Sequence, residues 1–212
     1  MPLQKVPIDF WFAVGSTYAY LTVSRLPSVQ AATGVPFRWR PFDVRAIMIE
    51  MENIPFSTKP AKEAYMWRDI ERRAANHGLP FEGIPPYPLK GYARANRVAT
   101  VAAREGWIAD FAQAAYRKWF LERLDPGDDK TIAVVLGKLG QHAERVLAAA
   151  DSDEVRAALA RETDTARSLG IFGSPTFVVG KEIFWGDDRL EDALRWHGGH
   201  SSLQEGSIKR KP

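Results

Sequence analysis

Cysteine is absent from the 212-residue sequence, and this absence narrows the possible chemistry. Without thiols the chain forms no disulfide, no thiolate metal site and no thiol nucleophile of its own. Long hydrophobic runs are missing too, since no window approaches the roughly 18 apolar residues of a membrane-spanning helix. The N-terminal stretch also lacks the apolar core and small-residue cleavage site of a secretory signal. We therefore expect a soluble cytoplasmic protein that does not associate with a membrane.

An excess of one charge is also lacking. Lys and Arg total 29 against 26 for Asp and Glu, so the net charge is only +3, and the basic residues are scattered along the chain. This pattern argues against a nucleic-acid binder, although it accommodates small anionic ligands. The 45% apolar and 11% aromatic content is enough for a full core in one large or two small domains.

Common catalytic motifs are missing as well. The sequence holds no phosphate loop, dinucleotide fingerprint or zinc motif, so we expect no resident metal. The segment "VGSTY" lacks the second glycine of a Gly-x-Ser-x-Gly nucleophile elbow, which disfavours a serine hydrolase. The histidines show no partner spacing, and those in the tail could bind metal only adventitiously; they are His77, His142, His197 and His200.

The N-terminal segment reads as a strand, a helix and a second strand. An apolar run over residues 6–13 predicts a buried strand, and helical spacing begins at Ser16 and ends near Gly34. A second strand is predicted over 37–42, ending at a proline. Because a helix connects the two strands, we expect them to lie parallel with a right-handed crossover.

A helical block and then a hairpin follow. Residues 43–169 are rich in Ala and Arg with a periodicity near 3.6, which predicts a group of helices. Strands are predicted at 176–179 and 182–184, on either side of a Gly-Lys turn. Asp187 or Asp188 is positioned to cap a last helix. The predicted order is therefore βαβ, helices, ββα.

Two local features stand out. Ser16 lies where a strand is expected to give way to a helix, so its hydroxyl could simply cap that helix, or it could stabilise an anion near the helix N-terminus. Pro175 directly precedes a predicted strand, a place open to proline at a sheet edge, at a first strand residue or at a special peptide bond.

Four segments carry a resemblance to a known family. They are "DFWFAVGSTYAYL", "ENIPF", "GIFGSPTFVV" and "FWGDDRLEDAL". In these the chain resembles the 2-hydroxychromene-2-carboxylate isomerases and kappa-class glutathione transferases, within the DsbA-like branch of the thioredoxin superfamily. The resemblance covers residues 8 to about 196. It departs from the family pattern at Thr17, where a proline is usual, and at Ser174, where an apolar residue is usual.

The resemblance implies an α/β fold with a discontinuous thioredoxin-like domain and a large all-helical insertion. The thioredoxin-like βαβ…ββα domain would comprise residues 1–42 and 170–197, with the insertion over 43–169 and a flexible tail over 198–212. A homodimer formed through the helical insertion would fit the habit of the family.

The resemblance further implies a glutathione site. Ser16 would donate a hydrogen bond to the glutathione sulfur and hold it as a thiolate, since a donor to the charged form lowers a thiol pKa from about 8.5. The absence of cysteine then has a reason, because the thiol arrives with the cofactor. Ser174, before a cis Pro175, would offer its backbone N–H and C=O to the cysteinyl unit.

The remaining family positions match the two ends of the tripeptide. Asn53 and Lys62 would meet the glycyl carboxylate, and Asp188, with the backbone near Asp187, would take the γ-glutamyl ammonium. Arg189 would orient that aspartate or form part of the wall. Each also has an ordinary interpretation: a turn residue for Asn53, a solvated charge for Lys62 and a helix cap for Asp188.

A small aromatic substrate would fill an apolar space between the two domains. The aromatic residues expected to line this space are Phe12, Tyr18, Tyr87, Tyr92 and Trp185. Others at helical spacing are assigned to the core; these are Tyr65, Trp67, Trp119 and Phe120.

Three functional hypotheses follow. The first is a glutathione-dependent isomerase of aromatic-compound catabolism, such as naphthalene degradation, that acts by reversible thiolate addition to a conjugated double bond. Its enolate would need a donor or cation that the sequence does not identify. The second is a kappa-like transferase that conjugates glutathione to an electrophile. The third is a non-catalytic glutathione-binding or partner-binding protein. A dithiol oxidoreductase is excluded because there is no cysteine.

Overall fold

A four-stranded sheet organises the chain. The computed structural model describes residues 6–53, 56 and 59–199. The strand order is β2-β1-β3-β4, and the strands are β1 (Ile8–Phe12), β2 (Phe37–Pro41), β3 (Thr176–Val179) and β4 (Glu182–Trp185). β1 pairs with β2 in parallel, and β3 runs antiparallel to both β1 and β4. The predicted βαβ unit and C-terminal hairpin are therefore confirmed.

Helix α1 (Ala19–Thr33) connects β1 to β2, and it begins later than predicted. It ends at Gly34, whose φ of 63° lets its N–H bond back to Gln30. The prediction of a helix start at Ser16 is wrong, so its hydroxyl caps no helix. The Ser16 carbonyl instead accepts a hydrogen bond from the hydroxyl of Tyr116, 3.0 Å away, and the chain passes through turns before the helix begins.

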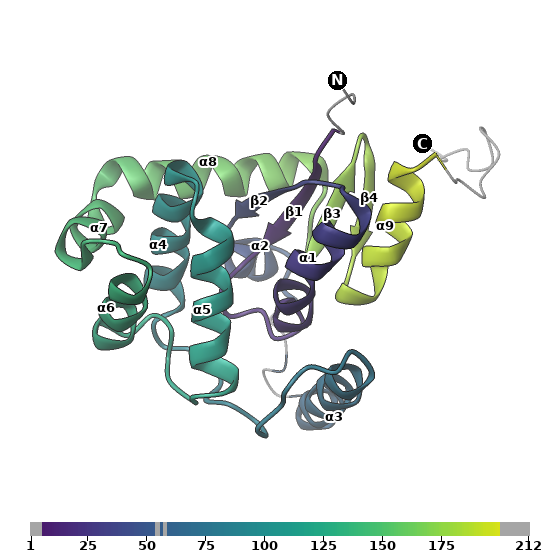
Figure 1. Cartoon of the computed structure of the whole chain (residues 1–212), viewed down its shortest axis with the longest axis horizontal. Coiled ribbons are helices and arrows are strands. Elements are labelled where there is room, and N and C mark those ends of the chain that lie inside the picture. Colours follow the sequence, from purple (N-terminus) through teal and green to yellow (C-terminus); the bar gives the residue numbers. More distant parts are fainter. Residues whose placement is uncertain (1–5, 54–55, 57–58, 200–212) are drawn as a thin grey trace.

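Among the residues described, seven helices lie between β2 and β3, and two short helical segments follow β4. The first group comprises α2 (Val44–Glu50), α3 (Pro60–Asn76), α4 (Tyr92–Glu105), α5 (Ile108–Phe120), α6 (Asp129–Lys138), α7 (Ala143–Asp151) and α8 (Asp153–Leu169). The second comprises η1 (Asp187–Arg189) and α9 (Leu190–His197). Figure 1 shows α4 and α5 side by side to one side of the sheet, α8 along the upper edge, and α3 set apart below.

One continuous core joins the sheet to the helices. Phe10 stacks on Phe177 across β1 and β3 with ring centroids 5.5 Å apart, and the same buried cluster includes Trp119 and Phe120 of α5. The core prediction is confirmed for Trp67, Trp119 and Phe120. It is wrong for Tyr65, which is 61% exposed because α3 turns its Met66 and Ile70 face inward.

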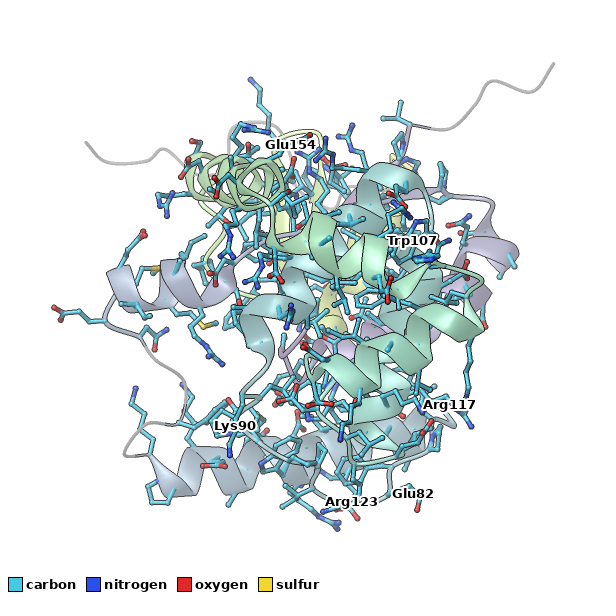
Figure 2. All side chains as sticks on the ribbon, turned by 90° about the vertical axis from the view of Figure 1, so that its left-hand side faces the viewer. Glu82, Lys90, Trp107, Arg117, Arg123 and Glu154 are labelled. Atoms are coloured by element: carbon cyan, nitrogen blue, oxygen red, sulfur yellow. The ribbon has the colours of Figure 1, made fainter. Side chains whose placement is uncertain are left out.

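Charged side chains cover the outside of the described structure. Figure 2 shows Glu154 at the top of the molecule and Lys90 at the lower left, with Arg117, Glu82 and Arg123 near one another at the lower right. Across the described ranges, no helix is long and apolar enough to cross a membrane.

Candidate functional site

Ser16 and Ser174 meet where β1 ends and β3 begins. The antiparallel pairing of these strands places the turn after β1 beside the peptide before β3. The Ser16 hydroxyl donates to the Ser174 carbonyl at 2.6 Å, and the Ser174 hydroxyl accepts from the Ala13 N–H at 3.0 Å. The Ser174-Pro175 peptide is cis. Two predicted site residues that lie far apart in the sequence are therefore in direct contact at this "Ser16 corner", defined here as residues 13–17 with 174–175.

Two buried helix residues form hydrogen bonds to the backbone of the Ser16 corner. Asn96 of α4 is fully buried; its amide oxygen accepts from the Val14 N–H, and its amide nitrogen donates to the Val14 carbonyl, both at 2.9 Å. The hydroxyl of Tyr116 on α5 lies 2.9 Å from the Ala13 carbonyl and 3.0 Å from that of Ser16. Burial raises the pKa of Tyr116 well above its ordinary value, so the phenol keeps its proton as a donor.

Sequence analysis missed both of these residues. Asn96 carried a usable signal, because it is a lone polar amide on the inward face of an Ala-rich helix and buried polar groups need partners. Tyr116 carried none, since a buried tyrosine in an aromatic helix looks like ordinary core.

A tight fit also fixes Gly15 beside Ser16. Its φ of 113° is a conformation that other residues rarely adopt. A Cβ at this position would lie 2.6 Å from Cδ2 of Tyr92, so the tyrosine ring packs directly against the backbone next to Ser16.

Helix α3 contacts the two residues that follow Ser16. The Thr17 hydroxyl donates to the Met66 sulfur at 3.0 Å, and the Tyr18 hydroxyl donates to Asp69 at 3.0 Å. Lys62 lies one helical turn before Met66 and therefore on the same side of α3. Its ammonium is exposed and lies 6.0 Å from the centroid of the Phe56 ring.

The "ENIPF" motif is only partly described. Asn53 is exposed, and its N–H donates to the Met48 carbonyl at 2.9 Å, while residues 54 and 55 lie outside the described part of the chain. The roles expected for Asn53 and Lys62 stay predictions.

The aspartates after β4 have different surroundings. Asp187 is 2% exposed and accepts three hydrogen bonds, of 2.7 to 3.2 Å, from Arg73 of α3. Burial raises the pKa of this carboxyl, and Arg73 acts in the opposite direction. Neither Asp187 nor Asp188 caps a helix, which corrects that expectation: Asp187 anchors α3 instead. Asp188 is exposed and pairs with Arg189 at 2.6 Å, which is the contact that an orienting role for Arg189 requires.

The aromatic residues predicted to line a substrate space differ in burial. Phe12 is fully buried and stacks on Phe10 at 5.2 Å, so it belongs to the core and its assignment to a substrate space is wrong. Trp185 is 53% exposed and packs against Phe172 at 4.8 Å. Tyr18 and Tyr87 are half-buried, and Tyr92 is buried against Gly15.

A cavity of about 360 Å³ lies between α2, α4 and α8, lined by residues that include Asp43, Ala46, Tyr92, Asn96, Leu159 and Thr163. Tyr92 is the one predicted site residue among its lining. The Tyr92 hydroxyl donates to Asp43 at 2.8 Å there. Within the part of the chain that the structure describes, no group of three or more His, Asp or Glu side chains could hold a metal ion.

Comparisons with known proteins agree with this fold. Residues 7–195 match the family model described as "DSBA-like thioredoxin domain". The chain is 27% identical over 186 residues to a 2-hydroxychromene-2-carboxylate isomerase of Sphingobium xenophagum, covering 87% of this chain and 94% of the relative. It is 25% identical to glutathione S-transferase kappa 1 of Caenorhabditis elegans, covering 89% of each.

A solved structure agrees as well. The structure of a 2-hydroxychromene-2-carboxylate isomerase superposes with a TM-score of 0.80 at 25% identity, covering 93% of this chain and all of that chain. Similarity therefore extends over nearly the whole length in sequence and in structure.

Proposed function

We propose, on the premise that the chain belongs to the DSBA-like thioredoxin domain family, that it binds glutathione at the Ser16 corner and is a glutathione-dependent cis-trans isomerase. The proposed reaction interconverts 2-hydroxychromene-2-carboxylate and trans-o-hydroxybenzylidenepyruvate, or a related intermediate of aromatic catabolism. The names of the similar proteins support this chemistry. The observation that carries the proposal is the Ser16 hydroxyl bound to the Ser174 carbonyl beside Pro175, in a chain without cysteine.

The backbone of Ser174 suits a peptide-like ligand. The residue is 8% exposed, and its N–H donates to none of the residues that the structure describes. Within the described part of the chain, its carbonyl accepts only from the Ser16 hydroxyl. A buried N–H without an acceptor costs free energy, so a ligand carbonyl that accepts from it is favoured. One cysteinyl unit carries a carbonyl that can accept from the Ser174 N–H and an N–H that can donate to the Ser174 carbonyl.

Ser16 has a donor role in this proposal. Glutathione, when bound, supplies a thiolate that adds reversibly to the conjugated double bond and so permits rotation about it. By donating to the sulfur, the Ser16 hydroxyl stabilises the charged form and lowers the thiol pKa. To do so it releases the Ser174 carbonyl, which becomes free to accept from the ligand. The two serines therefore give up one internal hydrogen bond and form three with the ligand: one from the Ser16 hydroxyl to the sulfur, and two between the Ser174 backbone and the cysteinyl unit.

The other predicted residues complete the proposed site. Asn53 and Lys62 would bind the glycyl carboxylate, and Asp188, held by Arg189, would bind the γ-glutamyl ammonium. The two-domain division at residues 42/43 and 169/170, a homodimer and a cytoplasmic location belong to the same proposal.

Calorimetric titration with reduced glutathione, together with the ultraviolet absorbance of the bound thiolate, tests the proposal. Wild type should bind and show thiolate absorbance, and Ser16→Ala should lose the thiolate signal. Because the buried Ser174 carbonyl also loses its donor, the free energy of unfolding of Ser16→Ala should fall by about 1 to 3 kcal/mol, which leaves the protein folded. Ser168→Ala, which removes an exposed hydroxyl on α8, is the matched control and should bind like wild type. Absence of binding by wild type at millimolar glutathione would refute the proposal.

A catalytic assay separates the isomerase from a transferase. With a chromene carboxylate as substrate, an isomerase turns over many molecules without consuming glutathione. A kappa-like transferase consumes one glutathione per turnover and releases an adduct that retains the tripeptide.

A further inference from the structure

Thr17 follows Ser16 directly, and two hydrogen bonds hold it in place. The residue is 6% exposed. Its hydroxyl donates to the Met66 sulfur at 3.0 Å, and its carbonyl accepts from the Tyr20 N–H at 3.2 Å. Two of its three polar groups are therefore used within the protein, and these contacts fix the orientation of the Thr17 backbone beside Ser16.

The third polar group of Thr17 is its backbone N–H, which donates to none of the residues that the structure describes. The N–H of Ser16 just before it is already occupied, because it donates to the Ala13 carbonyl at 3.0 Å. An N–H of a buried residue that lacks an acceptor is uncommon and costs free energy. A ligand atom that accepts from the Thr17 N–H is therefore favoured at this position.

The position of this N–H suits the ligand sulfur of the proposed function. Only a few covalent bonds separate the Ser16 Oγ from the Thr17 nitrogen, so an atom bound by the hydroxyl can also lie within hydrogen-bond reach of the N–H. A thiolate carries a full charge and several lone pairs, and it can accept from both donors at once.

We propose that the Thr17 backbone N–H is a second hydrogen-bond donor to the glutathione sulfur, beside the Ser16 hydroxyl. This inference rests on the proposed function and deepens it. Two donors stabilise the thiolate more than one does, so the thiol pKa falls further. A thiol of lower pKa is also a better leaving group, which suits an isomerase because it must release its substrate from the sulfur again.

Removal of the N–H tests the proposal. Thr17→Pro removes it, because proline has no N–H and is the usual residue of the family pattern at this position. Thr17→Val is the matched control, since it loses the same hydroxyl but keeps the N–H. The absorbance of bound glutathione is followed across the pH range in which its thiol ionises. Thr17→Pro should raise the thiol pKa by about one to two units, about a 10- to 100-fold change in the ionisation constant, and Thr17→Val should match wild type.

A comparison of double variants separates this effect from an indirect one. Proline restricts the backbone of the residue before it, so Thr17→Pro could act by displacing the Ser16 hydroxyl. Both substitutions are therefore repeated together with Ser16→Ala, where no hydroxyl remains to be displaced. If the N–H donates to the sulfur, Thr17→Pro should still raise the thiol pKa by about one unit or more relative to Thr17→Val in this background.

Amide NMR of the unaltered protein gives a second readout that does not depend on a variant. With glutathione bound, the Thr17 amide proton should shift as the thiol ionises. With ophthalmate, a glutathione analogue in which a methyl group replaces the thiol, the shift should be absent over the same pH range. The Ser16 amide, which already donates to the Ala13 carbonyl, is the internal control and should move much less.

The outcomes separate this inference from the proposed function. Equal thiol pKa values in Thr17→Pro and Thr17→Val, loss of the difference in the Ser16→Ala background, or a Thr17 amide that does not respond to thiol ionisation overturns the inference. The proposed function survives each of these results, because glutathione still binds. Failure of wild type to bind glutathione refutes the proposed function, and the inference falls with it.

Discussion

Replacement of Asn96 by alanine tests how the Ser16 corner is held. The change removes the two side-chain hydrogen bonds, each of 2.9 Å, that satisfy the N–H and C=O of Val14. Val14 is fully buried, so both backbone groups are left without a protein partner. An unsatisfied buried polar group costs about 1 to 3 kcal/mol, which gives about 2 to 6 kcal/mol for the pair.

The surroundings favour the lower part of that range. Asn96 also lines the cavity between α2, α4 and α8, so water can enter the space left by the amide and hydrogen-bond to Val14. We therefore expect the free energy of unfolding to fall by about 2 to 3 kcal/mol, and glutathione affinity to fall because the turn that carries Ser16 is less well positioned.

Urea unfolding followed by tryptophan fluorescence measures the first effect, and calorimetry measures the second. Thr100→Val is the matched control: it removes a buried hydrogen bond of 2.9 Å from the same helix, made to the Asn96 carbonyl. It should cost about 1 kcal/mol and leave glutathione affinity unchanged. If Asn96→Ala costs no more than Thr100→Val, the account of how the corner is held is refuted.

Two further predictions concern backbone contact and a buried ion pair. Gly127→Ala should lower the free energy of unfolding by about 2 to 3 kcal/mol, because its Cβ would lie 1.9 Å from the carbonyl oxygen of Gly91. Gly137→Ala, at an open position in a helix, should instead raise the free energy of unfolding by about 0.5 to 1 kcal/mol. Equal shifts of the two variants in thermal unfolding would contradict this. Arg73→Gln should lower the free energy of unfolding by about 3 kcal/mol at neutral pH, because the buried Asp187 carboxylate loses the cation that pairs with it. That cost should shrink as the pH falls through the raised pKa of Asp187, since the protonated carboxyl needs no cation; a cost independent of pH in urea unfolding would disprove it.

The sequence predicted what depends on local pattern. Alternation and turn residues located the β3–β4 hairpin, and the glycine signal located the end of α1 at Gly34. The start of α1 was misplaced because the Ser16 carbonyl is bound by Tyr116, 100 positions away, and no window around Ser16 contains that information.

The candidate site divides in the same way. Motifs brought Ser16 and Ser174 together correctly, because strand pairing follows from the fold. They could not show that Asp187 is bound by Arg73, since that contact depends on how α3 packs.

The sheet order has a consequence for how the chain is made. β1 lies inside the sheet, between β2 and β3, yet Ala13 and the Ser174 that bonds to it are 161 positions apart. During synthesis β2 follows β1 quickly and can pair with one edge of β1. The other edge of β1, which includes Phe10, Trp11 and Phe12, stays unpaired until the β3–β4 hairpin has left the ribosome. An unpaired apolar strand edge invites association with other chains. Premature termination before β3 should therefore yield an aggregating fragment, and the newly made chain needs protection until β3 and β4 have emerged from the ribosome.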